Sequence, residues 1–224
     1  SAFRPLRKPA PARPSSDFAQ VINLGELTTP ADLMLRGPDT THSVRFFIAR
    51  DRLVRVADLK LRYRTAPGLI AAASHLVVTL NVTVVATLPV STNPVASTDT
   101  TLTVPADLLK HENRLGFELI GHYSAQCEDP ANASVWAQID PTSTIELSGS
   151  RLSMTNDLAS LPLPFYDAGG NKRPAVPIVF AATPSPEALQ AAAIIASWFG
   201  ALAAPRQIRF PVSLGTIPAG NAIV

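Results

Sequence analysis

The chain has 224 residues, 46% of them hydrophobic and 16% charged, with a formal net charge of +2. This composition is typical of folded proteins that bury a sizeable core, and it excludes an intrinsically disordered chain. Residues 1–16 contain four basic residues and no acidic residue, so subtracting their +4 from the total leaves −2 for the remaining residues. We therefore predict a flexible, basic, proline-rich leader over residues 1–19 and no basic patch for nucleic acid on the folded body.

Residues 20–155 are dominated by short segments in which apolar and polar residues alternate. Leu59, Leu61 and Tyr63 alternate with charged residues, which indicates a strand with one buried and one solvated face. Similar alternation recurs, with turn signals between the runs, in residues 43–49, 75–80, 82–88, 114–123, 135–139 and 143–148. Asn81 is expected in a hairpin turn in which Val82 takes a position that suits glycine better. The pattern predicts a β-sandwich of the jelly-roll type.

The pattern changes after residue 155. Residues 156–176 are rich in proline and glycine and are predicted to be a domain linker. A short buried strand at 178–180 is followed by a helix with Ser185 as N-cap, and this helix is apolar all round, which predicts packing on more than one side. Further strands are expected near the end of the chain. Residues 177–224 therefore read as the first, incomplete part of a parallel α/β domain.

The sequence contains no run of the roughly 20 apolar residues that span a bilayer. Its longest apolar segment begins with Glu187 and is rich in alanine, so it is interpreted as the buried helix already described. Arginine and proline interrupt the first residues, which therefore do not resemble a signal peptide. One cysteine cannot form a disulfide within this sequence.

Reactive and aromatic side chains are dense between residues 121 and 140, where they comprise His122, Tyr123, Cys127, Glu128, Asp129 and Trp136. Adjacent side chains in extended structure point apart, whereas a glycosidase needs two carboxylates facing each other across roughly 5–10 Å. The sequence also has neither a nucleophile elbow nor paired cysteine and histidine ligands. We therefore predict a protein that is not an enzyme, with no metal and no cofactor, in which Glu128, Asp129 and Pro130 form a turn.

Two binding functions remain to be weighed. The start of the helix after Ser185 is a natural place for a phosphate, but Pro184 and Pro186 lack N–H donors and no glycine or lysine completes the site. The rings of Tyr123 and Trp136 could stack on a sugar, although an isolated tryptophan in a sandwich strand usually belongs to the core. A sugar platform formed by Tyr123 and Trp136 therefore remains the alternative to a position in the core.

Residues 118–140, ELIGHYSAQCEDPANASVWAQID, resemble the G-H-Y-x-x-x-C-E-[DN]-P signature, and the tryptophan segment after it, of the B subunit of bacterial cellulose synthase (the BcsB family). Collinear segments that also resemble the family are residues 46–69, 156–167, 178–203 and 210–224. The resemblance runs from about residue 21 to the end of the sequence. Val82 and Tyr166 stand where glycine and phenylalanine are common, without affecting the expected function.

The resemblance implies a non-catalytic subunit at the periplasmic face of the bacterial inner membrane, anchored by a C-terminal helix that is absent here. Carbohydrate-binding-like jelly rolls and flavodoxin-like domains alternate in the family, so residues 20–155 would be the first jelly roll and residues 177–224 the start of a flavodoxin-like domain. The implied partners are the catalytic A subunit and cellulose, a β-1,4-glucan, and a homo-oligomer is compatible with the resemblance.

The alternative function is that of a cyclic di-GMP-binding regulatory protein, the name that family members often carry. The family's nucleotide site lies in the PilZ domain of the A subunit, and its R-x-x-x-R motif has no counterpart here. We therefore expect no direct binding of cyclic di-GMP.

The resemblance places Cys127 in an oxidising periplasm, where we expect a disulfide to a cysteine beyond residue 224, with a buried free thiol as the alternative. Residues 121–136 are expected to form an architectural corner of the jelly roll. Trp136 is predicted to point inward, away from its neighbours Val135 and Ala137. Any contact of His122, Tyr123 or Trp136 with glucan is then expected to be weak.

Overall fold

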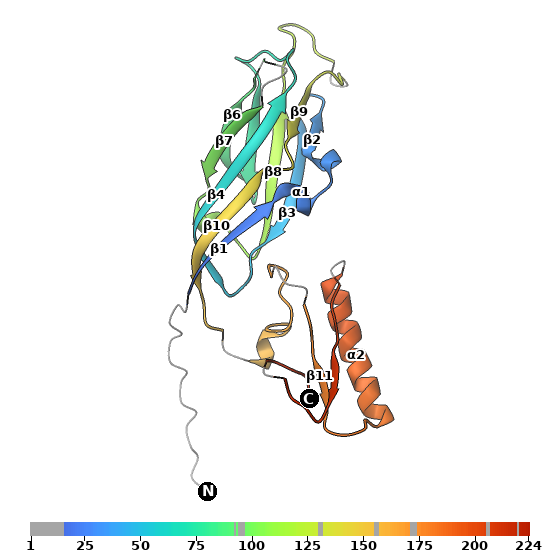
Figure 1. Ribbon diagram of the computed structural model, residues 1–224. Coiled ribbons are helices and arrows are strands. Elements are labelled where there is room, and N and C mark those ends of the chain that lie inside the picture. The colour runs from blue at the N-terminus through green and yellow to red at the C-terminus, as the bar shows by residue number, and fades with distance from the viewer. Residues whose placement is uncertain are drawn as a thin grey trace. The chain divides into compact units, whose positions relative to one another are not determined.

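The computed structural model describes residues 16–224 except 92, 94–96, 130–131, 155–156, 171–173, 205–206 and 219. The chain forms two compact units that meet at Ser153 and Met154, coloured from blue to yellow and from orange to red in Figure 1. Residues 1–15 of the predicted leader lie outside the described residues. Residues 16–19, which we also assigned to the leader, are instead the beginning of the first strand.

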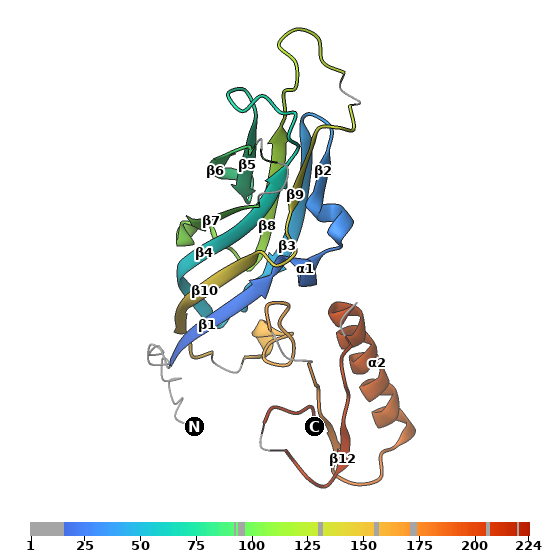
Figure 2. The same ribbon diagram turned by 45° about the horizontal axis from the view of Figure 1, so that its top comes forward.

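The first unit contains two antiparallel sheets (Figure 1 and Figure 2). In the six-stranded sheet the path runs through β1 (Ser16–Asn23), β10 (Thr144–Arg151), β4 (Arg52–Thr65), β9 (Trp136–Ile139) and β2 (Met34–Arg36), and β7 (Thr98–Thr103) pairs with β4. The four-stranded sheet has the order β3 (Thr40–Phe47), β8 (Glu112–Ile120), β5 (His75–Leu80) and β6 (Thr83–Pro89).

The core of this unit is built from the inward-facing residues of both sheets, as the alternation predicted. Leu59, Leu61 and Tyr63 of β4 are each 1% exposed, and Phe46 and Phe117 of the other sheet are equally buried. Only short helical turns interrupt the strands, namely α1 (Leu24–Leu27), η1 (Pro30–Leu33) and η2 (Ala106–Leu108). The predicted β-sandwich is therefore confirmed.

The predicted hairpin connects β5 to β6 through the two residues Asn81 and Val82. Their φ angles of 50° and 68° are those of a type I′ turn, which matches the right-handed twist of the strands. Asn81 also joins the turn to the sheet, because its amide nitrogen donates to the Leu108 carbonyl at 2.8 Å and its amide oxygen accepts from the Arg114 N–H at 2.9 Å. Val82 is 92% exposed in a backbone conformation that disfavours β-branched residues.

The second unit contains η3 (Leu158–Ser160), β11 (Ile178–Phe180), α2 (Pro186–Ala203) and β12 (Val212–Leu214). β11 and β12 are parallel, with α2 between them in sequence. Ser185 is the N-cap of α2, and its hydroxyl accepts from the Ala188 N–H at 3.3 Å. No helix in the described part of the chain is long and apolar enough to cross a membrane.

Two features of the second unit differ from the predictions. Within α2 only Phe199 and Ala203 are buried, while Ile194 and Trp198 are 63% and 45% exposed, so the helix packs on one side in this chain. The segment predicted as a linker is also structured, since the Phe165 ring lies edge-on to that of Phe199 with centroids 5.7 Å apart. Its described residues belong to the second unit.

Candidate functional site

The outer face of the six-stranded sheet is polar, and β4 lies at its centre. Because Leu61 and Tyr63 point into the core, Lys60, Arg62 and Arg64 alternate onto the solvated face and are exposed. This row of cations lies beside β7 on one side and beside the segment that joins β9 to β10 on the other. The face therefore offers charged and hydrogen-bonding groups along the length of one strand.

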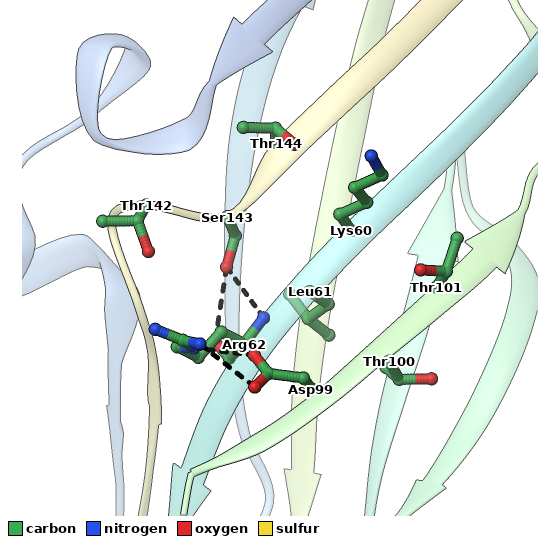
Figure 3. Close-up of a pocket in the computed structure, with 9 residues that line it drawn as sticks. All are labelled: Lys60, Leu61, Arg62, Asp99, Thr100, Thr101, Thr142, Ser143 and Thr144. Atoms are coloured by element: carbon green, nitrogen blue, oxygen red, sulfur yellow. Dashed lines mark hydrogen bonds and ion pairs between the residues drawn. The ribbon is translucent and has the colours of Figure 1, made fainter.

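Beside this row the surface is hollowed into a groove of about 440 Å³, which we call the hydroxyl-lined groove. β4 forms its floor, β7 one side, and the start of β10 with the preceding loop the other side (Figure 3). The groove is lined by Lys60, Leu61, Arg62, Asp99, Thr100, Thr101, Thr142, Ser143 and Thr144. Hydroxyl groups predominate, and each can both donate and accept a hydrogen bond.

Arg62 and Asp99 form a bidentate ion pair across the groove. The Arg62 Nε and Nη2 atoms lie 2.6 and 3.1 Å from the two carboxylate oxygens of Asp99. These hydrogen bonds raise the pKa of the Arg62 guanidinium and lower the pKa of the Asp99 carboxyl. Ser143 fixes the backbone at the same point, because its hydroxyl accepts from the Arg62 N–H at 3.0 Å. The charged groups of the groove are thus held in place before any ligand binds.

The remaining charges of the groove are also balanced by neighbours. Lys60 Nζ lies 2.8 Å from Glu146 Oε1 on β10. At the rim, Asp140 accepts hydrogen bonds from the hydroxyl and N–H of Thr142 at 2.6 and 2.9 Å, which lower the pKa of the Asp140 carboxyl. The groove therefore presents oriented polar groups with little net charge.

Trp136 lies on the outer face of the same sheet, which corrects our prediction that it points inward. Its neighbours Val135 and Ala137 are 1% and 0% exposed and occupy the core side, while Trp136 is half-buried. Trp136 is paired with Arg36 across the β9–β2 ladder, and directly paired residues share a face. The next outward residue of β9, Gln138, accepts a hydrogen bond from Arg64 at 3.0 Å.

A further hollow of about 520 Å³ lies beside Gln138 at the edge of the sandwich, lined by Pro30, Ala31, Met34, Arg36, Thr40, His42 and Gln138. Arg36, opposite Trp136, is one of its residues, and Thr40 and His42 come from β3 of the other sheet. The hydroxyl-lined groove and Trp136 together make the outer face of the six-stranded sheet the strongest candidate for a binding surface.

The corner that follows β8 is organised by the Glu128 carboxylate. It accepts from the Tyr123 and Ser124 N–H groups at 2.6 and 3.0 Å and pairs with His122 Nδ1 at 2.8 Å. The hydrogen bond from Ser124, followed by that from His122, lowers the pKa of the Glu128 carboxyl. The Tyr123 hydroxyl in turn accepts from the Asp129 N–H. His122 and Tyr123 are therefore engaged in holding the loop itself.

Cys127 in this corner is a free, exposed cysteine, so the alternative of a buried thiol is wrong. Its predicted disulfide partner would lie outside this sequence and stays a prediction, and the turn at Pro130 lies partly outside the described residues. Among the residues that the structure describes, no group of three or more His, Cys, Asp or Glu side chains is placed to hold a metal ion.

Of the predicted site residues, His122 and Tyr123 lie together at the corner, and Trp136 lies on the sheet face. The hydroxyl-lined groove was missed by sequence reasoning. A signal for it was present, because β7 is a run of threonines around Asp99, and the polar residues of β4 alternate as Lys60, Arg62 and Arg64.

The described residues thus form a β-sandwich with a polar groove and a tryptophan on one sheet face. Residues 18–151 match the family model described as cellulose synthase BcsB, first CBM domain, and residues 157–224 match the first FD domain of the same family. The chain therefore belongs to the BcsB family.

Two relatives illustrate this membership. A protein of Pseudomonas fluorescens (strain SBW25) named cyclic di-GMP-binding protein is 38% identical over 212 residues, which cover 94% of this chain and 28% of the relative. A protein of the same name from Xanthomonas axonopodis pv. citri (strain 306) is 39% identical over 209 residues, covering 92% and 26% respectively. The chain thus spans little more than a quarter of the length of these relatives.

A solved structure of a family 35 carbohydrate binding module from an environmental isolate is more distantly similar. It is 16% identical, and the match covers 55% of this chain and 75% of that chain with a TM-score of 0.34. That likeness is too weak to support a conclusion about the site.

Proposed function

We propose that this chain is part of a non-catalytic subunit of a cellulose synthase, which stabilises the catalytic A subunit and guides the secreted β-1,4-glucan. The observation that carries the proposal is the match of residues 18–151 to the first CBM domain of BcsB. In the groove, the Asp99 carboxylate is engaged by Arg62 through two hydrogen bonds, which suits a binding role for this residue. The location that we propose is the periplasmic face of the inner membrane.

The outer face of the six-stranded sheet is the proposed glucan contact. A glucan is uncharged and rich in hydroxyl groups, which suits a groove whose hydroxyls are exposed and whose charges are mutually balanced. Trp136, which packs partly against the core, adds apolar surface on this face for the C–H groups of a sugar. A subunit that lets polymer pass must hold it loosely, so we expect a dissociation constant on the order of 1 mM.

The second unit is proposed to begin a flavodoxin-like domain. The parallel pairing of β11 and β12, with Ile223 bridging to Ile178, supports this assignment. The membrane anchor of the subunit is proposed to be a C-terminal helix.

Cys127 is proposed to cross-link the corner to a later part of the full-length protein. Its exposure makes the thiol available for such a bond. Peptide mapping of full-length protein under non-reducing conditions tests the idea, and a free Cys127 in every copy would contradict it.

The proposed function is tested in the full-length family protein, co-expressed with the catalytic subunit in membranes. Replacing Lys60 and Arg62 by alanine should lower glucan yield while the A subunit is still recovered with the complex. The matched control replaces Arg45 and Arg114 by alanine. These two residues pair across β3 and β8 on the other sheet. Equal glucan yield from both double variants and the wild type would rule out a glucan-guiding role for the groove.

The second candidate function is a cyclic di-GMP-binding regulator, favoured by the names of the relatives. Calorimetric titration of the purified chain with cyclic di-GMP and with cello-oligosaccharides separates the two functions. We expect binding of the oligosaccharides only.

A further inference from the structure

The outer face of the six-stranded sheet carries a line of side chains that continues past the hydroxyl-lined groove. Lys60, Arg62 and Arg64 occupy every second position of β4 and are exposed on this face. Beyond Arg64 the line passes to β9, whose outward residues are Gln138 and Trp136. We call these five residues the β4 track. It forms one binding surface only if its members are in contact from end to end.

The groove end of the track is a row of three paired residues. Lys60 is directly opposite Thr144 of β10 on one side and Thr101 of β7 on the other. Directly paired residues share a face, so two hydroxyl groups flank the lysine on the outer face (Figure 3). Lys60 Nζ lies 2.8 Å from Glu146 Oε1. This end therefore offers hydroxyl groups on both sides of a cation whose charge is balanced.

The middle of the track is continuous, because its polar groups interact from one residue to the next. Hydrogen bonds from Thr142 lower the pKa of the Asp140 carboxyl most. The positive charges of Arg62 and Arg64 lower this pKa further, so Asp140 lies within electrostatic reach of both arginines. Arg64 in turn donates to the Gln138 side chain at 3.0 Å. The groove is therefore connected to β9 without a break.

The far end of the track is the Trp136 side chain. The Ala66 N–H donates to the Trp136 carbonyl at 2.9 Å, which places the tryptophan beside the chain two residues beyond Arg64. Trp136 is half-buried and shares the outer face with its exposed partner Arg36. An indole ring offers apolar surface to the C–H groups of a sugar, whereas the groove end offers hydroxyl groups. The two ends therefore recognise different parts of a sugar chain.

The length of the track sets the length of the ligand. From Lys60 to Ala66, beside Trp136, the chain advances by six residues, or about 20 Å at the rise of an antiparallel strand. A sugar unit in an extended chain is about 5 Å long, given covalent bonds of about 1.5 Å. The track therefore has room for about four sugar units. A disaccharide can contact only one of its ends.

We propose that the β4 track binds an extended, unbranched, β-linked glycan of about four or more sugar units, which lies along β4 and contacts both ends at once. The proposal rests on the glucan contact proposed above and adds the direction, the minimum length and the shape of the ligand. Groups fixed along one strand favour a chain that is itself extended, because a chain that curls leaves the strand. A helical α-1,4-linked glucan of equal length should therefore bind more weakly.

The test measures affinity by nuclear magnetic resonance titration, which detects binding in the millimolar range. The ligands are cellobiose, cellotetraose, cellohexaose and, as the helical counterpart, maltohexaose. Thr101→Val removes a hydroxyl group at the groove end, and Trp136→Ala removes the ring at the far end. Thr41→Val is the matched control, since Thr41 is an exposed threonine of β3 in the other sheet. All variants are measured in the whole chain.

For the wild type we expect affinity to rise about tenfold from cellobiose to cellotetraose, and by less than about threefold from cellotetraose to cellohexaose, because the track is then filled. With cellotetraose, Thr101→Val should lose about threefold in affinity and Trp136→Ala about tenfold. With cellobiose, at most one of these two variants should lose affinity. Thr41→Val should stay close to the wild type with every ligand.

The outcomes distinguish this proposal from the glucan contact itself. Equal affinity for cellobiose and cellohexaose, or for cellohexaose and maltohexaose, would overturn the track and leave a glucan contact on this face. Loss of cellotetraose affinity in only one of the two end variants, or an equal loss in Thr41→Val, would also overturn the track. No saturable binding of any of the four ligands would overturn both proposals.

Discussion

The hydroxyl-lined groove differs from a second hollow of the same sandwich, of about 560 Å³, in the charges of its lining. In the groove each cation has a carboxylate partner, Asp99 for Arg62 and Glu146 for Lys60. The second hollow, which we call the basic hollow, is lined by Arg50, Arg52 and Lys110 together with His111 and apolar residues, and its lining contains no acidic residue. An uncharged polymer needs oriented hydrogen bonds without a net field. The groove therefore suits such a ligand better than the basic hollow does.

The largest expected effect is on the stability of the sandwich that carries both hollows. Gly149 lies at a register shift in β10, opposite the part of β4 between the two hollows. A Cβ atom added there would lie 2.0 Å from the Leu53 carbonyl oxygen, so the backbone would have to move. We expect Gly149→Ala to destabilise the sandwich by about 3 kcal/mol, measured by denaturant unfolding.

Gly68→Ala is the control for this change, because its added Cβ would meet no atom within 4 Å. It should alter the free energy of unfolding by less than about 0.5 kcal/mol. If the two variants have the same free energy of unfolding, the register shift at Gly149 does not set the spacing of the two sites.

Trp136→Ala sharpens the comparison from the side of the groove. Since Trp136 is half-buried on the outer face, we expect a loss of about 1–2 kcal/mol in stability, below the roughly 3–5 kcal/mol of a core tryptophan. Affinity for cello-oligosaccharides should fall about tenfold. Thermal melting and calorimetry measure the two effects.

The chain's other tryptophan supplies the control. Trp198 lies in α2 of the second unit and is 45% exposed. Trp198→Ala should leave oligosaccharide affinity unaltered, and an equal loss in the two variants would argue against a sugar contact at Trp136.

Asp99→Asn is designed to break the comparison, because it removes the carboxylate that forms the bidentate pair with Arg62 and leaves Asp140 as its acidic neighbour. We expect oligosaccharide affinity to fall about threefold, the equivalent of one hydrogen bond, and weak phosphate binding to appear in the groove. Calorimetry with each ligand checks both. Unchanged affinity for both ligands would mean that charge balance does not select the ligand.

The smallest effect is a pH dependence at the corner outside both sites. Hydrogen bonds lower the pKa of the folded Glu128 carboxyl, so its contribution to stability is present above the unfolded pKa of about 4.3 and is lost as pH falls through the lowered value. The melting temperature of the wild type should exceed that of Glu128→Gln near neutral pH. The difference should shrink below about pH 4. A constant difference across this range would contradict the role given to the carboxylate.

The sequence was sufficient for the features that depend on local pattern. The alternation in β4, the hairpin at Asn81 and the N-cap at Ser185 all follow from the periods and preferences of short segments. Trp136 shows how such reasoning was misapplied. Val135, Ala137 and Ile139 alternate as the apolar face of this strand, and the polar Gln138 shares the face of Trp136, so the alternation itself places Trp136 on the outer face.

Both hollows depend instead on contacts between distant residues. Arg62 meets Asp99 across 37 positions, and the segments around positions 50 and 110 come together only when β3 and β8 pair. Sequence charge counts sum over the whole chain and cannot show which charges become neighbours. This is why the body, with a formal charge of −2, still carries a basic hollow.

The central claim is tested most directly by nuclear magnetic resonance, in which an isotope-labelled chain is titrated with a cello-oligosaccharide. The account predicts that the oligosaccharide shifts signals of Trp136, Arg62 and Thr101. Shifts confined to the basic hollow, or no saturable shift on the outer face of the six-stranded sheet, would contradict it.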